Sequence, residues 1–269
     1  MFTFSPLQIT LASAVSNDQQ QIIDVQNQLS AGKRTLNAGE NGIVTRLASQ
    51  ASAYDTSVKN ITSAQSVLSV GSTTLTSMSS IATQLKNIAT QGASAGLATS
   101  DRDSLATTFA SLYSQLTTLS TAASINGNNI VNSATALTVK YDPTQSAFSM
   151  TGVDMPTAIA AATTSAAVAD NTTFTQTLAG TIVTEMTTFL DAISTAQGSI
   201  TSYSVALDAM TTGAKGVSAS LNSTIDSIQN VDSTAMQAKL QSLNNQQSID
   251  YYLVSQMNTE SAAILAIFR

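Results

Sequence analysis

Two long stretches of this chain contain no proline and carry an apolar side chain at alternating steps of three and four residues. The prolines are Pro6, Pro143 and Pro156, so the chain on either side of the last two is free to be helical. Steps of three and four average 3.5 residues, the repeat of α-helices that pack along one another in a coiled coil. The pattern therefore predicts a mainly α-helical chain in which each long helix buries one apolar stripe.

The apolar stripe is longest in the segment before residue 90. There it passes through Leu47, Tyr54, Val58, Ile61, Leu68, Leu75, Ala82, Leu85 and Ala89. A helix from Leu47 to Ala89 is about 65 Å long at 1.5 Å per residue. Similar stripes follow over residues 105–123 and 189–228. We therefore expect a rod-like, antiparallel bundle of long helices of the coiled-coil type.

Turn signals divide these helical stretches. Residues 32–42 (GKRTLNAGENG) separate the first helix from the second, and Gly92–Gly96 interrupts the pattern again. Residues 100–103 (SDRD) are typical of a helix N-terminus, with Ser100 as the capping residue and acidic side chains in the first turn.

A different pattern occupies the middle of the chain. Residues 136–141 and 146–150 flank the sequence DPTQ, which predicts a small β-hairpin within about residues 134–150. Residues 151–172 then form a short segment that we expect to be variable. Its alanine- and threonine-rich part, residues 157–169, is either a short helix or a loop.

The residue types that are missing exclude most chemistry. The chain has no His and no Cys, so it lacks the commonest general base, the usual zinc ligands and any thiolate nucleophile. We therefore expect no catalytic residue, no metal site and no cofactor. Ten Lys and Arg stand against 16 Asp and Glu, which argues against nucleic acid as a partner. No apolar run reaches about 18 residues, so we expect no membrane insertion.

Four short motifs resemble those of bacterial flagellins. Residues 28–37 (QLSAGKRTLN) resemble the LSSG-x-R-I-N signature near the start of that family, and residues 121–130 (TAASINGNNI) resemble its T-x-F-N-G turn. Residues 231–235 (VDSTA) are similar to the D-A-D-Y-A-T hinge, and residues 263–269 (AILAIFR) to the L-x-L-L-R ending. Their order and spacing, with both chain ends matched, make the resemblance specific to the flagellin fold.

The resemblance implies a subunit that is exported unfolded through the flagellar type III apparatus, without a cleaved signal, and polymerises outside the cell into the filament used for swimming. Residues 1–42 and 232–269 would form an inner domain of paired terminal helices, and residues 43–231 a surrounding rod domain. The expected partners are other copies of the chain, together with the flagellar cap, junction proteins and an export chaperone.

The same resemblance places the assembly contacts on the terminal stripes. Their uncharged Ser, Thr, Asn and Gln flanks can pack against copies of themselves at little desolvation cost, and charged residues make up only 10% of the chain. The predicted interface residues are Leu7, Leu11, Val15, Ile22, Val25, Leu29, Leu240, Leu243, Val254, Met257, Ile264 and Phe268.

Two further groups of residues are candidates for function. Lys33, Arg34, Glu40 and Arg46 form a charge cluster between the first two helices, where they are either a solvated loop or ion pairs of a hinge or subunit contact. Flagellins recognised by the vertebrate innate receptor carry a segment like L-Q-R-x-R-E-L-x-x-Q. The similar stretch here has Gln84, Lys86, Asn87 and Ile88, so the Arg and Glu that would bind most strongly are missing.

Other functions remain as alternatives to a filament subunit. A hook–filament junction protein shares the terminal helices of flagellins, although the Ile-Phe-Arg ending and the hairpin favour flagellin. A secreted coiled-coil translocator would need a basic amphipathic helix or a long apolar hairpin, and neither is visible. An enzyme is the weakest alternative.

Overall fold

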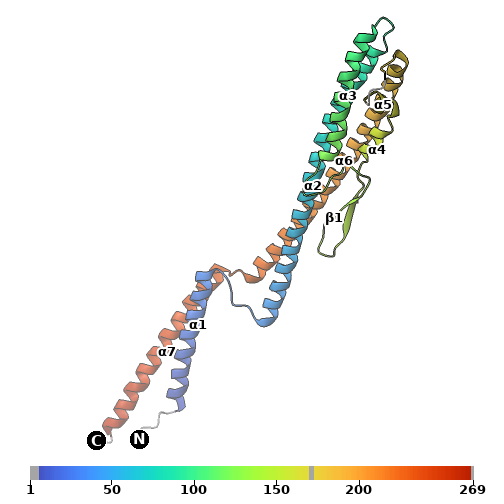
Figure 1. Ribbon diagram of the computed structural model, residues 1–269. Coiled ribbons are helices and arrows are strands. Elements are labelled where there is room, and N and C mark those ends of the chain that lie inside the picture. The colour runs from blue at the N-terminus through green and yellow to red at the C-terminus, as the bar shows by residue number, and fades with distance from the viewer. Residues whose placement is uncertain (1–5, 170–172, 268–269) are drawn as a thin grey trace. The chain divides into compact units, whose positions relative to one another are not determined.

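A computed structural model describes residues 6–169 and 173–267 (Figure 1). Within these ranges the chain forms, in order, α1 (Pro6–Ala31), α2 (Ala38–Gly92), α3 (Thr99–Ala122), β1 (Leu137–Lys140), β2 (Ala147–Met150), α4 (Met155–Ala160), α5 (Thr163–Ala169), α6 (Gln176–Gln229) and α7 (Ser233–Ile267). The predicted fold class, mainly helical with one small hairpin, is confirmed. The chain divides into two compact units: unit 1 is residues 1–49 with 220–269, and unit 2 is residues 50–219.

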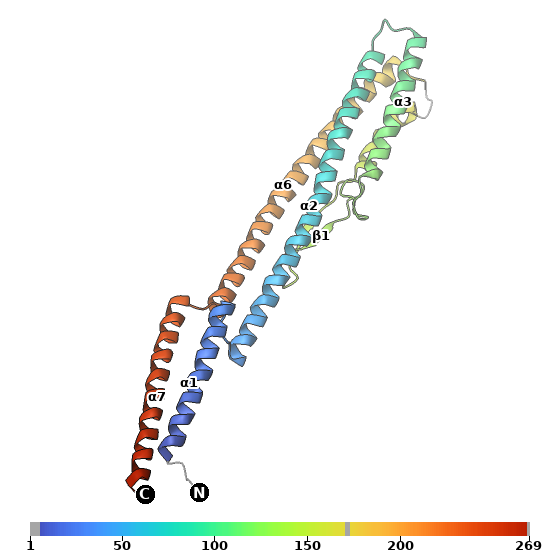
Figure 2. The same ribbon diagram turned by 90° about the vertical axis from the view of Figure 1, so that its left-hand side faces the viewer.

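In unit 1, α1 and α7 lie side by side and antiparallel, as two views of the chain show (Figures 1 and 2). Ile22, Val25 and Leu243 are buried between them, and Met236 and Leu240 pack against this small cluster. All of them except Met236 are among the predicted interface residues. Gly32 then ends α1 in the left-handed conformation, with φ of 66°, which glycine adopts without steric strain.

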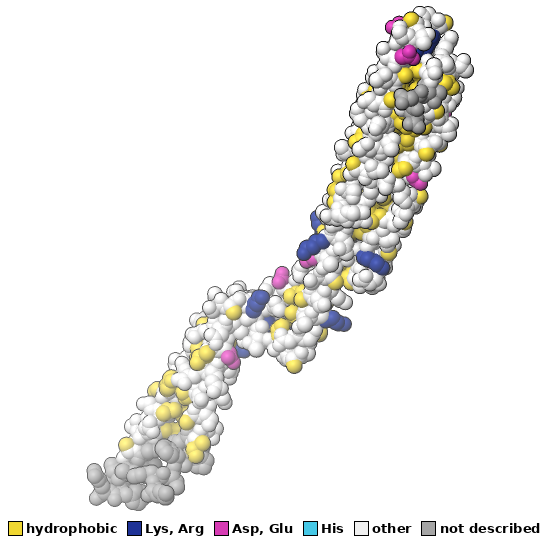
Figure 3. Space-filling view, viewed as in Figure 1, with side chains coloured by type: hydrophobic (Ala, Val, Ile, Leu, Met, Phe, Trp, Pro, Cys, Tyr) yellow, Lys and Arg dark blue, Asp and Glu magenta, His cyan; other side chains and the backbone are white. Residues whose placement is uncertain are grey.

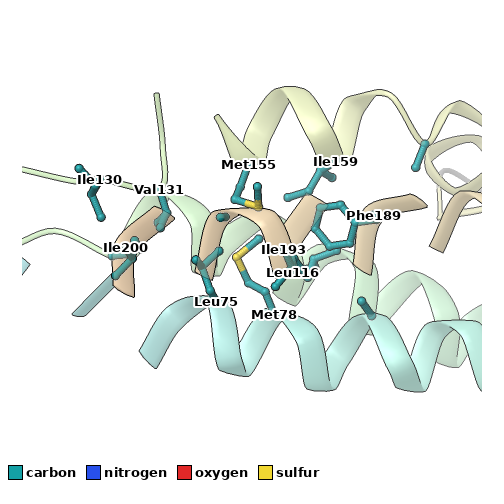
Figure 4. Close-up of a cluster of buried hydrophobic side chains, with 14 of the residues drawn as sticks. Leu75, Met78, Leu116, Ile130, Val131, Met155, Ile159, Phe189, Ile193 and Ile200 are labelled. Atoms are coloured by element: carbon teal, nitrogen blue, oxygen red, sulfur yellow. The ribbon is translucent and has the colours of Figure 1, made fainter. Parts of the chain in front are cut away.

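Unit 2 has one continuous apolar core, to which α2, α3 and α6 each contribute a stripe. Figure 4 shows Leu75 and Met78 of α2 pointing toward Phe189 and Ile193 of α6, with Leu116 of α3 beside them. The predicted positions Ile61, Leu68, Leu75, Ala82, Leu85 and Ala89 are all fully buried. The 3.5-residue period thus marks the core of this unit correctly.

The hairpin forms where the sequence predicts it. β1 and β2 pair antiparallel, with Leu137 opposite Met150 and Lys140 opposite Ala147. The Asp142 carboxylate accepts hydrogen bonds from the Ser146 backbone N–H (2.8 Å) and the Thr144 hydroxyl (2.9 Å), which closes the turn between the strands.

Residues 157–169, which the sequence leaves open between helix and loop, lie mostly in the short helices α4 and α5, where Met155, Ile159 and Val168 are part of the core. The Tyr113 hydroxyl donates to the Ile159 carbonyl (3.0 Å). Burial, together with the negative charge of Glu185, raises the pKa of Tyr113 to about 12. The phenol therefore keeps this proton at neutral pH.

Glu185 of α6 holds the start of α5. Its carboxylate accepts hydrogen bonds from the backbone N–H groups of Thr164 (2.9 Å) and Ser165 (2.8 Å), and from the Ser165 hydroxyl (2.7 Å). Burial by itself raises the pKa of Glu185, but these hydrogen bonds outweigh it and hold the pKa below its ordinary value. Glu185 therefore stays ionised and caps α5 from a neighbouring helix.

The start of α3 differs from the expectation. The helix begins at Thr99, with Ala98 as the N-cap and no side-chain capping bond, so the expected cap at Ser100 is wrong. Arg102 organises this corner instead. Its guanidinium donates to the carbonyl oxygens of Gly92 (3.0 Å) and Leu97 (2.9 Å) and to that of Ser94 (2.6 Å). These bonds satisfy carbonyls at the end of α2 and in the turn before α3.

Candidate functional site

Large apolar side chains lie on the outer faces of the α1–α7 pair. Ile249 is 59% exposed and Tyr252 66%, on α7, and Ile9 and Ile23 on α1 are more than half exposed. Figure 3 shows hydrophobic side chains at the surface of this pair, with few charged side chains among them. Unit 1 itself offers nothing in its described residues to cover these side chains, so the surface is suited to burial against another protein chain.

The residues predicted for assembly lie mostly between α1 and α7. Ile22, Val25 and Leu243 are buried, and the half-buried members are Leu11, Val15, Leu29, Leu240, Val254 and Met257. Phe268 and the side chains of Leu7 and Ile264 lie outside the described residues. The outward residues Ile23, Ile249 and Tyr252 are missing from the prediction. Their signal is an apolar residue off the stripe, on a face that is otherwise polar.

An open groove of about 760 Å³ runs along one end of this pair. It is lined by Ile9, Leu11, Ala12, Val254 and Met257, with Ser13, Ser16, Asn17 and Asn258 as polar neighbours. Apolar walls with a few amide and hydroxyl groups are suited to an apolar side chain with polar flanks. That is the composition of the terminal helices themselves.

The predicted charge cluster is partly assembled. Arg34 forms an ion pair with Glu40, 2.6 Å between nitrogen and oxygen, and its Nε donates to the Ile228 carbonyl near the end of α6 (2.5 Å). Its backbone N–H also donates to the Gln229 carbonyl (2.8 Å). In the part of the chain that the structure describes, Lys33 and Arg46 form no ion pair. Arg34 thus connects the α1–α2 link to the end of α6.

Glu40 also caps α2. The Asn37 side chain accepts from the Glu40 backbone N–H (2.8 Å), and the Glu40 carboxylate accepts from the Asn37 backbone N–H (3.0 Å), a reciprocal capping box. The Asn37 N–H and the Arg34 guanidinium hold the pKa of Glu40 below its ordinary value. This cap starts α2 at Ala38, so the link is shorter than residues 32–42, and the expectation that all of them separate the helices is wrong.

The segment compared with the receptor-binding motif lies on α2. Gln84 and Asn87 are exposed there, while Lys86 and Ile88 are half-buried. No three His, Cys, Asp or Glu side chains among the described residues are arranged to hold a metal ion, and no helix among them is long and apolar enough to span a bilayer.

Comparison with known proteins identifies the family. A family profile described as the bacterial flagellin N-terminal helical region matches residues 5–136. Flagellins FljO and FljK of Caulobacter vibrioides are each 26% identical over 267 residues, covering 95% of this chain and 93% of theirs. The chain belongs to the bacterial flagellin family.

A solved flagellin supports the fold of this flagellin chain. The crystal structure of Bacillus cereus flagellin matches with a TM-score of 0.51 at 20% sequence identity, covering 58% of this chain and 88% of that one. The match to the flagellins of Caulobacter extends through both terminal helices and the middle of the chain. Flagellins are structural proteins, which agrees with a site made of apolar surface.

Proposed function

We propose that this flagellin is a structural subunit that polymerises with copies of itself into the extracellular filament of the bacterial flagellum. The observation that carries the proposal is the outer face of the α1–α7 pair, where Ile9, Ile23, Ile249 and Tyr252 are exposed. Burying these side chains between subunits removes apolar surface from water, and each Å² removed stabilises the filament by about 25 cal/mol.

The contact is heterologous, because Ile23, Ile249 and Tyr252 of one subunit meet a different surface of the next, to which Ile9 belongs. Such contacts build open helical polymers when the rotation between neighbours does not close a ring. The groove along Ile9 and Met257 is a suitable receiving surface. The flagellar cap, junction proteins and an export chaperone are the further partners that we propose from the family. Flagellin relatives that cover 95% of the chain support a filament subunit over a junction protein.

The long helices of unit 2 support a filament that tolerates salt. From residue 60 to 85, α2 has no charged side chain. The exposed hydroxyls of Thr62, Thr73 and Thr83 each donate to a backbone carbonyl four residues earlier. Because these donors are already satisfied, a neighbouring subunit can cover them at little cost, and salt has few charge pairs to screen.

Assembly of the purified chain tests the proposal directly. We expect concentrated protein to form filaments visible by negative-stain electron microscopy. These should persist at about 1 M salt, where the Debye length is about 3 Å. A chain that stays monomeric when seeded with filament fragments would refute the filament function, and filaments that dissolve in salt would refute the uncharged contact.

Replacing Arg34 by Ala should change filament shape. The substitution removes the ion pair with Glu40 and the bond to the Ile228 carbonyl. Each subunit loses little stability, because an exposed ion pair is screened by water, but the change repeats in every subunit. We expect altered helical pitch or lower yield in electron micrographs. Arg46→Ala is the control because Arg46 is exposed and unpaired among the described residues. Unchanged morphology in R34A would contradict the hinge role.

We also expect weak activation of the vertebrate innate receptor. Gln84 and Asn87 are exposed on α2 but cannot supply the charge-assisted bonds of an Arg and a Glu. Losing two such contacts predicts a response roughly 100-fold weaker than that of an enteric flagellin. Reporter cells treated with matched amounts of both proteins measure this, and an equal response would disprove it.

A further inference from the structure

Asp18 is the only charged side chain among the described residues that is buried. It is 4% exposed and lies on the stripe of α1, one helical turn before Ile22, on the side that packs against α7. Asp18 therefore places a carboxylate in an otherwise apolar stripe, inside a small two-helix interface.

No donor satisfies all of this carboxylate. Its Oδ2 atom is inaccessible to solvent and has no hydrogen-bond partner in the described residues. The adjacent Gln19 amide donates to the Tyr251 hydroxyl (2.8 Å), which places residues near Tyr251 of α7 at the level of Asp18. The half-buried side chain beside Tyr251 is Asp250, another acid, which in its ionised form has no proton to donate.

No cation is at hand to neutralise Asp18. The segment that forms α1 contains no Lys or Arg. The one basic residue in α7 is Lys239, about 18 Å from Tyr251 along the helix at 1.5 Å per residue. A buried carboxylate without a counter-ion or full hydrogen bonding destabilises the structure that buries it.

The interface that must offset this penalty is small. Among the described residues, its fully buried apolar side chains are Ile22, Val25 and Leu243, with Met236 and Leu240 packed against them. Ile23 and Ile249 point away from the interface and contribute little while they stay exposed. The α1–α7 pair of a free subunit is therefore close to the limit of stability.

We infer that Asp18 is a built-in destabiliser, which keeps the α1–α7 pair weak in the free subunit until other copies cover its outer faces. The inference rests on the proposed filament function. Contacts made by neighbouring subunits on the outer faces outweigh the buried charge in the polymer. Premature pairing and uncontrolled growth are disfavoured in the free chain, where those contacts are missing.

Hydrogen exchange of the monomer tests the first part. Asp18→Asn keeps the shape and removes the charge, and Asp18→Leu continues the apolar stripe. We expect both variants to slow exchange of the α1 and α7 amides by about tenfold, because Asn removes the buried charge and Leu removes the unsatisfied polar group as well. Asp24→Asn is the matched control, with the same charge change at an exposed position on α1. Exchange that is unchanged or faster in both Asp18 variants would overturn the inference.

Polymerisation tests the second part. We expect the concentration needed for seeded filament growth to fall several-fold in the Asp18 variants and to stay constant in Asp24→Asn. Slower exchange without easier growth would refute the link to assembly. A wild-type chain that never forms filaments would refute the proposed function instead, and the exchange result would be unaffected by that failure.

Discussion

Replacing Ile249 by Asp should abolish filament formation while leaving the free subunit folded. Ile249 is 59% exposed in the subunit, so the carboxylate remains in water before assembly and costs little there. In the proposed filament contact the same position is buried, and an unpaired charge there costs several kcal/mol per subunit. We expect the critical concentration to rise at least about 100-fold, as measured by sedimentation of seeded polymers.

The control places the same charge on the other side of α7. Asn244 is exposed and lies about 140° around the helix from Ile249, at 100° per residue. Asn244→Asp is close in shape, and we expect it to assemble. Circular dichroism of both variants should match the wild type. If I249D assembles normally, the outer face of α7 is not a subunit contact.

Replacing Gly152 by Ala should strongly destabilise unit 2. A Cβ atom there would lie 2.1 Å from the Ser133 carbonyl oxygen and 2.8 Å from that of Thr135. Both are backbone atoms, which cannot rotate away as a side chain can. The segment would have to move, and with it Met155, which is buried in the core. We expect a loss of about 3 kcal/mol in the free energy of unfolding, measured by urea denaturation.

Gly213→Ala is the matched control. Gly213 is exposed in the middle of α6, and an added Cβ meets no atom within 4 Å. Alanine is the better helix former, so this variant should gain about 0.5–1 kcal/mol. If Gly→Ala lowers the free energy of unfolding at Gly152 and raises it at Gly213, the loss comes from the close contact at Gly152 and not from the added methyl group itself. A G152A chain as stable as the wild type would show that the close approach to Ser133 is relaxed in solution.

The helices could be predicted from the sequence because a single repeat governs them. Ile61, Leu75 and Leu85 are fully buried and all lie on the 3.5-residue pattern, which proline does not interrupt. An apolar stripe is buried whichever helix it packs against, so its burial can be predicted without knowing the partner helix. The hairpin could also be predicted from the sequence, because its turn residues and its alternating strands are local signals.

Features that depend on distant partners could not be predicted in this way. Glu185 caps α5 by accepting from the backbone N–H of Thr164, 21 positions earlier in the chain, and Arg102 closes a corner through three backbone carbonyls. Neither contact leaves a periodic signal. Ile249 leaves one local signal, as an apolar residue off the stripe, but the spacing does not show which surface covers it. By contrast, the capping box of α2 follows a local sequence signature, N-x-x-E beginning at Asn37, and could be predicted from the sequence.

The α2–α6 seam joins parts of the chain that are far apart in sequence. The hydrogen bond between Gln65 and Asp208 spans 143 positions, and that between Asp55 and Ser218 spans 163. By contrast, Tyr113 and Ile159 are 46 apart. Closing a longer loop loses more chain entropy before any contact forms, and a high contact order slows folding. Although mainly helical, this subunit should therefore fold at the pace of a protein with non-local pairing, and the side of α2 that packs against α6 remains uncovered until most of the chain has been made.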